Sequence, residues 1–397
     1  MSRRWVARSR LAGLALLAAL GLSGCSSLPV WMVVQGRSQI TDYRHFDNAP
    51  IRRAAEPSPL PAEPAALQWP GGQDEATSMA DLAKRGSVAL LVARRGQLVV
   101  ERYFNGYDAD SMATSFSMAK SVVSLLVGIA IDQGRIASVD EPVTTYLPEL
   151  LANDPRFAHI RLRHLLSMRS GIRFDEGYDT PWTEAARFYL APDMRREVAA
   201  LRIQRAPDQA YSYQSGDTQL LAMAVERATG QALAPYAERM LWQPLGAQHD
   251  ASWSLDSAAG GVARGFCCLN ARAVDYLRLG LMVLGEGQYN GQRIVSADWL
   301  RQSTAAQAGL PGADDAAQRN IERPGQPQAA FYTWQWRRRP LLGLTPAQPS
   351  AMVYAQGLYG QILLIDPTTQ TVALRLGRDT GGRHWPIWLD QLVRLNP

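Results

Sequence analysis

The spacing of apolar residues along the chain predicts where its strands and helices lie. Residues 87–94 and 97–103 are two apolar runs separated by Arg95-Gly96, a pattern that predicts a β-hairpin. Residues 117–131 are apolar on nearly every face, which is typical of a helix that is buried on all sides. Helical spacing also predicts helices within residues 160–171, 184–204, 216–245 and 270–284.

Strand patterns return near the C-terminus. Three apolar runs predict strands at residues 331–337, 360–365 and 371–376, and an amphipathic helix is expected at 385–395. Residues 305–330 are rich in Gly, Pro, Ala and Gln and predict a long surface loop. Strands at both ends with helices between them favour an α+β fold. We expect one antiparallel sheet built from both ends of the domain and flanked by helices, with a mainly helical subdomain at about 112–260.

The first 24 residues have the pattern of an export signal. Four arginines precede an apolar segment of 12 residues, 11–22, which is too short to span a bilayer easily. Leu22-Ser23-Gly24-Cys25 resembles the lipobox of bacterial lipoproteins, and this resemblance implies that Cys25 carries a lipid. Residues 25–66 contain scattered prolines and predict a tether between the membrane and the domain at 67–397. A plain secretory signal with an incidental cysteine is the alternative.

Charge and cysteine content exclude several classes of protein. The formal net charge of +5 falls to +1 without the four arginines of the predicted signal, so the sequence predicts no nucleic-acid partner. Cys267 and Cys268 are neighbours in sequence, and a bridge between adjacent residues is strained. We therefore expect them to be small buried apolar residues without a disulfide.

A Ser-x-x-Lys pattern opens the most apolar predicted helix. Ser117 and Lys120 are three residues apart, so in a helix they lie on one face about a turn apart. The chain has only two lysines, Lys84 and Lys120, and otherwise uses arginine for positive charge. A buried lysine can lose its proton, whereas arginine cannot. Taken alone, the pattern fits either a serine nucleophile with a lysine base or a chance spacing.

No other stretch offers a competing nucleophile and base. The chain contains no Gly-x-Ser-x-Gly or His-Glu-x-x-His pattern, and its five histidines are scattered. The sequence therefore predicts neither a metal nor a cofactor. Tyr213 lies in the loop 211–217, ahead of a predicted helix, and is a candidate second proton carrier. The alternative is that Tyr213 fills a packing gap.

These motifs, in this order, resemble those of the serine β-lactamase-related hydrolases. That family includes class C β-lactamases, carboxylesterases, DD-peptidase-like proteins and 6-aminohexanoate-dimer hydrolases. The resemblance covers roughly residues 75–395. The stretches that carry it are Ser117–Lys120, Tyr213-Gln214-Ser215, Leu165–Gly171, Pro244-Leu245-Gly246 and Ala355-Gln356-Gly357.

The resemblance implies a β-lactamase/transpeptidase-like fold and an acyl-enzyme reaction. Ser117 is the implied nucleophile, Lys120 accepts or relays its proton, and Tyr213 passes a proton to the leaving group. The N–H groups of Ser117 and Leu358 are the implied oxyanion hole.

Two departures from the family pattern concern the substrate. Ser215 stands where the family has asparagine, and residues 355–357 lack the lysine that holds the carboxylate of penicillins. The Gly-x-x-Gly-Gln stretch that begins at Gly357 is similar to the 6-aminohexanoate-dimer hydrolase branch. Candidates for the substrate pocket are Tyr178, Ser215, Gly357 and Tyr359, although Tyr178 also fits packing on its own subdomain.

The sequence thus predicts a serine hydrolase for a small amide or ester, lipid-anchored in the bacterial envelope and facing the periplasm, at the outer membrane. The alternatives are a β-lactamase, a DD-peptidase-like penicillin-binding activity, or a non-catalytic envelope-binding lipoprotein of the same fold.

Overall fold

The computed structural model describes residues 29–178, 180–305, 331–340 and 349–397. The chain divides into two units, residues 1–38 and 39–397. The described part of the smaller unit contains helix α2 (Val30–Gln35), which ends at Gly36 with a left-handed backbone (φ 70°). Within the described ranges, no helix combines the length and hydropathy needed to cross a membrane. The predicted signal, Cys25 and residues 306–330 lie outside the described residues.

A seven-stranded antiparallel sheet in the order β11-β12-β13-β14-β15-β2-β3 is built from both ends of the larger unit. The two ends meet where β15 pairs with β2, and the predicted hairpin is confirmed at its expected bounds. The strands are β2 (Ser87–Arg94), β3 (Gln97–Tyr103), β11 (Phe331–Tyr332), β12 (Arg337–Pro340), β13 (Pro349–Gly357), β14 (Gln361–Asp366) and β15 (Thr371–Gly377). The predicted strand at 331–337 is therefore two short strands with a turn between them.

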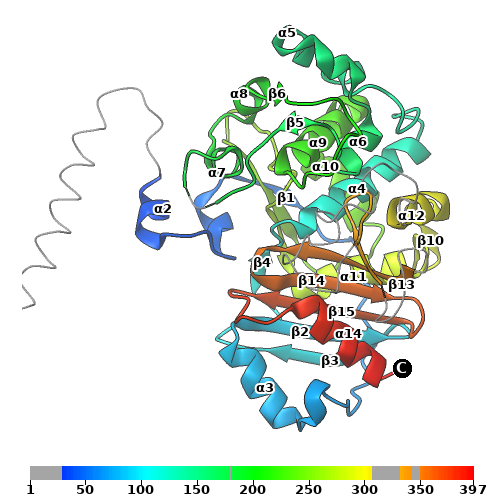
Figure 1. The fold of residues 1–397 in the computed structure, drawn as a ribbon. Coiled ribbons are helices and arrows are strands. Elements are labelled where there is room, and N and C mark those ends of the chain that lie inside the picture. Colours follow the sequence, from blue (N-terminus) through cyan, green and yellow to red (C-terminus); the bar gives the residue numbers. More distant parts are fainter. Residues whose placement is uncertain (1–28, 179, 306–330, 341–348) are drawn as a thin grey trace, which may run out of the picture. The chain divides into compact units, whose positions relative to one another are not determined.

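Helices cover both faces of this sheet. Ile362 and Leu364 of β14 join a buried cluster with α14 (Trp385–Leu395) and α3 (Glu75–Lys84). The residue between them, Leu363, faces α11 (Ala273–Leu284) on the other side of the sheet. The helix packs so closely there that a Cβ on Gly280 would lie 2.9 Å from Leu363 and 2.5 Å from Val372. This alternation follows from the two-residue period of a strand. Figure 1 shows α14 crossing the sheet and the helices α4–α10 gathered at one end of it.

Helix α4 (Met118–Asp132) is the central helix, and every residue from Met118 to Ala130 is buried, as its uniform hydrophobicity predicts. The helices predicted at 184–204 and 216–245 are each interrupted. Pro192 separates α7 from α8, and Gly230, with a positive φ of 69°, ends α9. The predicted helix at 270–284 begins instead with a strand, β8. The remaining helices are α5 (Leu150–Asn153), α6 (Leu162–Leu166), α7 (Glu184–Leu190), α8 (Met194–Ala199), α9 (Ser215–Thr229), α10 (Leu233–Ala237) and α12 (Ala297–Thr304).

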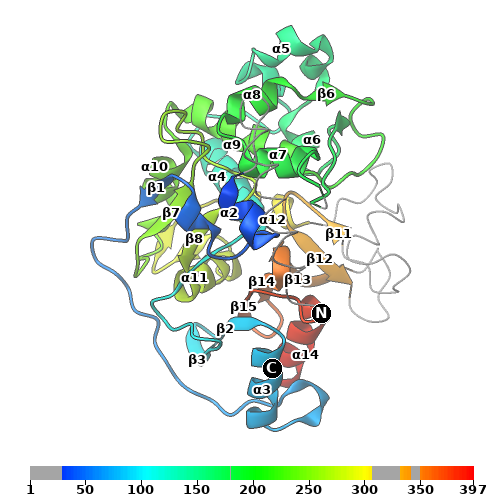
Figure 2. The same cartoon turned by 90° about the vertical axis from the view of Figure 1, so that its left-hand side faces the viewer.

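A second antiparallel sheet, β1-β7-β8-β4, supports the segment that leads into α4 (Figure 2). Its strands are β1 (Asn48–Ile51), β7 (Ala251–Ser254), β8 (Leu269–Arg272) and β4 (Met112–Thr114). Strand β1 corrects the predicted tether at 25–66, because Asn48–Ile51 pairs with residues some 200 positions later in the chain. Short elements complete the unit: η2 (Asp42–His45), η3 (Pro70–Gly72), η4 (Val143–Thr145), η5 (Pro155–His159), η6 (Glu238–Trp242), η7 (Leu358–Gly360), β9 (Gln288–Tyr289) and β10 (Gln292–Arg293).

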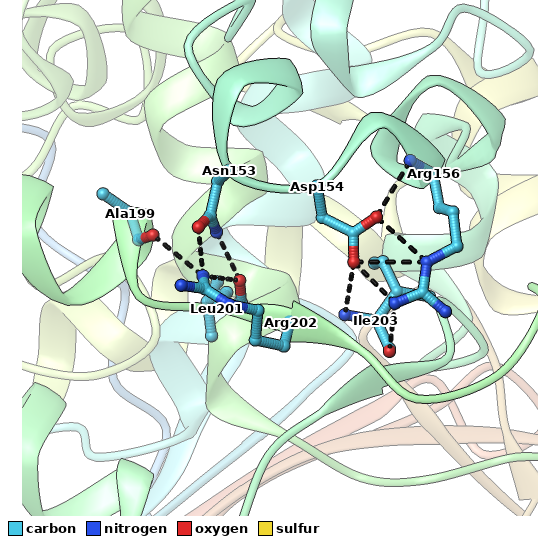
Figure 3. A network of polar contacts seen from close by, with 7 residues as sticks. All are labelled: Asn153, Asp154, Arg156, Ala199, Leu201, Arg202 and Ile203. Atoms are coloured by element: carbon cyan, nitrogen blue, oxygen red, sulfur yellow. Dashed lines mark hydrogen bonds and ion pairs between the residues drawn. The ribbon is translucent and has the colours of Figure 1, made fainter.

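A polar network joins residues 153–156, at the end of α5 and the start of η5, to residues 199–203 (Figure 3). The Arg156 guanidinium donates to Asp154 and to the Ile203 carbonyl, and it holds the pKa of the Asp154 carboxyl well below its usual range. These bonds fix β6 (Arg202–Ile203), which pairs with β5 (Ile172–Arg173). Because β5 runs directly into residues 174–178, the network positions that loop.

Candidate active site

Ser117 lies at the tip of a constrained turn between β4 and α4. Phe116, just before it, is buried and has a positive φ of 45°, which costs a bulky residue about 1–3 kcal/mol. The N–H groups of Met118, Ala119 and Lys120 donate to the carbonyls of Ser115, Phe116 and Ser117. These turn bonds use the N–H groups of residues 118–120. They do not use the N–H of Ser117, the N-cap residue of α4, which can therefore donate to an oxyanion.

Lys120 is 1% exposed and contacts the predicted nucleophile. Its Nζ lies 3.3 Å from Ser117 Oγ, 3.0 Å from Ser215 Oγ and 2.9 Å from the Phe266 carbonyl oxygen. The structure therefore places the Ser-x-x-Lys pair on one face of a buried helix, as its spacing predicts.

Ser215 is held between Lys120 and a carboxylate that the sequence did not indicate. Its Oγ donates to Glu176 Oε1 at 2.7 Å, and its N–H donates to Glu176 Oε2 at 2.6 Å. The carboxylate thus caps the start of α9. Burial raises the pKa of Glu176, against the opposing effect of the Lys120 cation. Ser215 was a candidate for the substrate pocket, and here its side chain is buried and its hydroxyl contacts both Lys120 and Glu176. Its role in substrate binding stays a prediction.

Tyr213 lies beside Lys120, so the structure brings together all three predicted catalytic residues. The Lys120 Nζ is 5.3 Å from the centre of the Tyr213 ring, within the range of a cation–π contact. The Arg337 guanidinium lies 5.3 Å from the same ring, and Tyr332 packs edge-on against it at 5.7 Å. Tyr213 is partly exposed, whereas Lys120 beside it is buried.

The end of β13 forms the wall opposite the Ser117 turn. A Cβ at Gly357 would lie 2.3 Å from the Ser115 carbonyl oxygen, so the two backbones are in direct contact. The next residue is Leu358, the second predicted oxyanion donor. Tyr359 follows with a positive φ of 62°, and its ring packs edge-on against Phe116 at 5.6 Å. These contacts bring Gly357 and Tyr359, both predicted pocket residues, to the nucleophile.

Two buried side chains hold this wall in place. Gln361 ends the Gly-x-x-Gly-Gln stretch that the sequence singled out, although its supporting role was not predicted, and Arg375 was not predicted at all. Gln361 donates to the carbonyls of Leu358 and Gly377 and accepts from the Gly377 N–H. Arg375, fully buried, donates to the carbonyls of Tyr359 and Gly360. Spacing could not reveal the bonds of Gln361 to Gly377 or those of Arg375 to Tyr359 and Gly360, because these bonds join residues of different strands and turns.

Tyr178 is 48% exposed and belongs to the loop that carries Glu176. Its hydroxyl lies 3.5 Å from Glu176 Oε1, at the limit of a hydrogen bond. A position beside Glu176 fits the edge of the site, and its role in binding stays a prediction.

Cys267 and Cys268 are buried as expected, but the expectation that they form no disulfide is wrong, because they are bonded to each other. Cys268 has a positive φ of 70°, a backbone conformation that periodicity does not reveal. The pair directly follows Phe266, whose carbonyl accepts from Lys120, and precedes Leu269, whose carbonyl accepts from Ser115. The disulfide therefore lies in the segment that supports both ends of the nucleophile turn.

Comparison with known proteins matches this geometry to one family. The Beta-lactamase family model matches residues 76–384. The chain is 29% identical over 333 residues to a 6-aminohexanoate-dimer hydrolase of Paenarthrobacter ureafaciens, covering 78% of this chain and 79% of that one. It is 32% identical over 184 residues to esterase EstB of Burkholderia gladioli, covering 41% and 45%.

Among solved structures, a Bacillus anthracis protein assigned provisionally as a 6-aminohexanoate-dimer hydrolase superposes with a TM-score of 0.74. Its identity to this chain is 22%, and the match covers 90% of this chain and 92% of that one. At this identity the likeness shows the fold alone, and it confirms the expected β-lactamase/transpeptidase-like architecture.

Proposed function

The chain belongs to the Beta-lactamase family of serine hydrolases, and we propose that it hydrolyses a small amide or ester through an acyl-enzyme on Ser117. The observation that carries the proposal is the contact of Lys120 with both Ser117 and the Tyr213 ring in a buried site. A serine is a weak nucleophile until a neighbouring base takes its proton, and Lys120 is positioned to do so.

The proposed reaction has two halves. Ser117 Oγ attacks the substrate carbonyl carbon while its proton passes to Lys120. The N–H groups of Ser117 and Leu358 stabilise the oxyanion that forms, and Tyr213 gives a proton to the departing amine or alcohol. Water then attacks the Ser117 ester, releases the acid and restores the enzyme.

The substrate class follows from what the site lacks and from the named relatives. Residues 355–357, Ala-Gln-Gly, offer no cation to a penicillin carboxylate. The relatives named above are a 6-aminohexanoate-dimer hydrolase and an esterase. These features favour a short linear amide or ester over a β-lactam.

Fluorophosphonate labelling tests the proposal, because the probe reacts covalently with an activated serine. We expect the wild-type protein to be labelled and Ser117→Ala to be inert. Turnover of a p-nitrophenyl ester or of the 6-aminohexanoate dimer, without turnover of nitrocefin, is expected for the proposed substrate class. If neither protein is labelled, the chain is a non-catalytic member of the fold; rapid nitrocefin turnover would make it a β-lactamase.

We also propose that Cys25 is lipidated and anchors the enzyme in the bacterial envelope, where it faces the periplasm. The lipobox-like Leu22-Ser23-Gly24-Cys25 after a short apolar segment supports this. Metabolic labelling with a clickable palmitate analogue should mark the wild-type protein but not Cys25→Ser. Equal labelling of both would exclude a lipid on Cys25, and fractionation would then locate the protein.

A further inference from the structure

The ammonium group of Lys120 has three acceptors for its three protons. They are Ser117 Oγ, Ser215 Oγ and the Phe266 carbonyl oxygen, at 3.3, 3.0 and 2.9 Å from Nζ. This arrangement suits the protonated lysine, which cannot accept the Ser117 proton. Lys120 must first lose a proton, and the three contacts define where that proton can go.

Only one of the three acceptors leads onward to a group that can keep a proton. A peptide carbonyl such as that of Phe266 is far too weak a base to hold one, and Ser117 is the nucleophile itself. Ser215 accepts from Lys120 and donates to Glu176 Oε1 at 2.7 Å. The two hydrogen bonds run in the same direction, from ammonium to hydroxyl to carboxylate.

The surroundings of Glu176 favour a carboxyl group that can take up this proton. Burial, which disfavours the ionised form, raises its pKa, and the Lys120 cation opposes that effect. Three other titratable groups interact electrostatically with Glu176: the Tyr178 hydroxyl at 3.5 Å in the same loop, Tyr211 in the loop before α9, and Asp217 on α9.

We propose that Glu176 is a positioning residue that stores the Lys120 proton, reached through the Ser215 hydroxyl. This inference rests on the proposed function, since it explains how Lys120 becomes a base. In the step, a proton passes from Lys120 Nζ to Ser215 Oγ while the Ser215 proton passes to Glu176 Oε1. The charged pair becomes a neutral amine and a neutral carboxylic acid, with no net proton gained or lost.

The neutral amine then takes the Ser117 proton as the Ser117–carbon bond forms. When the leaving group departs, Tyr213 gives it a proton and recovers one from the Lys120 ammonium. On deacylation, the neutral amine takes a proton from the attacking water. As the acyl–Ser117 bond breaks, that proton returns to Ser117 Oγ, and the relay can run back from Glu176.

The relay keeps its proton inside the site. We therefore expect kcat/KM to stay constant with pH over the range in which Lys120 and Glu176 together hold one proton.

The test measures kcat/KM against pH with a p-nitrophenyl ester for four proteins: wild type, Glu176→Gln, Ser215→Ala and Glu184→Gln. The amide of the Glu176→Gln variant keeps an accepting oxygen but cannot store a proton, and Ser215→Ala removes the relay while both charges remain. Glu184 lies in the same region and accepts from the Asp175 N–H, without contact to Lys120. Its variant is the matched control for replacing a carboxylate by an amide.

We expect Glu176→Gln and Ser215→Ala to be slower by about a hundredfold at pH 6.5, because Lys120 must then release its proton to water. The acid limb of the Glu176→Gln profile should move up by about two pH units, with recovery at high pH. Glu176→Asp should restore part of the flat profile, and Glu184→Gln should match the wild type.

Two results would overturn the inference. One is a Glu176→Gln variant as fast as the wild type below pH 7, which would mean that the carboxylate merely holds the proton on Lys120. The other is an equal loss at every pH, which would mean that Glu176 only caps α9. Either result leaves the proposed function intact if the wild type is still labelled by fluorophosphonate and Ser117→Ala is not. An unlabelled wild type would instead reject the proposed function.

Discussion

Replacing Gly357 by alanine tests how the two halves of the oxyanion hole are held together. The added Cβ would lie 2.3 Å from the Ser115 carbonyl oxygen, and real Cβ atoms essentially never approach closer than 3.0 Å. The end of β13 and the Ser117 turn must therefore separate by about 0.7 Å or more. Ser115 is tied to the Leu269 carbonyl at 2.8 Å, so the strand end that carries Leu358 is the part expected to move.

The expected loss follows from the sensitivity of catalysis to such displacements. Shifts near 1 Å at a reacting centre cost on the order of a hundredfold in rate, similar to the loss of one oxyanion donor. We predict that Gly357→Ala lowers kcat/KM for a p-nitrophenyl ester by about a hundredfold, or about 2.7 kcal/mol in activation free energy. Thermal unfolding followed by circular dichroism should show a folded protein.

Gly230→Ala is the matched control for the cost of removing a glycine. Its φ of 69° disfavours alanine by about 1 kcal/mol, but a Cβ there meets nothing within 4 Å. This variant should lose a few degrees in Tm and keep its activity. If Gly357→Ala kept more than about half of the wild-type activity, the close contact between β13 and the Ser117 turn would not form the oxyanion hole.

Three further substitutions probe the site and its support. Tyr213→Phe should slow hydrolysis of the 6-aminohexanoate dimer by about a hundredfold but slow that of a p-nitrophenyl ester much less, since p-nitrophenolate leaves without a proton; equal losses would contradict this role. Arg375→Leu, which strands the buried carbonyls of Tyr359 and Gly360, should lower the free energy of unfolding by about 3 kcal/mol in urea titrations; unchanged stability would contradict the assignment. Burial raises the pKa of Asp217 from 3.8 to about 8, so the stability provided by its proton is present below about pH 4 and is lost as the pH rises through 8. Asp217→Asn should therefore be more stable relative to the wild type at pH 8.5 than at pH 5 in thermal unfolding, whereas a pH-independent difference would contradict a buried neutral carboxyl.

Local periodicity accounts for what the sequence could predict. The hairpin at 87–103 is contiguous in sequence and interrupted only by Arg95-Gly96, so its bounds are correct. Ser117 and Lys120 are one helical turn apart, and the uniform hydrophobicity of α4 correctly indicates that Lys120 is buried. These features depend on residues close together in the chain.

The sheet built from both ends of the domain was predicted correctly, but other features that depend on distant residues were missed. Strand β1 contains Pro50 and resembles a tether until its pairing with β7 is seen. Glu176 lies in a loop whose pattern does not reveal that its side chain turns inward to Ser215, 39 positions later. The sequence did show a serine at 215, where the family has asparagine, and it is this hydroxyl that accepts from Lys120 and donates to Glu176.

Intact-mass and peptide-mass measurement of the acyl-enzyme tests directly whether Ser117 is the residue that carries the acyl group. The protein would be mixed with a slowly hydrolysed p-nitrophenyl ester, quenched in acid and digested. We expect a mass increase equal to the acyl group on the peptide that contains Ser117, and no such increase in Ser117→Ala. Turnover by Ser117→Ala at the wild-type rate, or an acyl group on another residue, would contradict it.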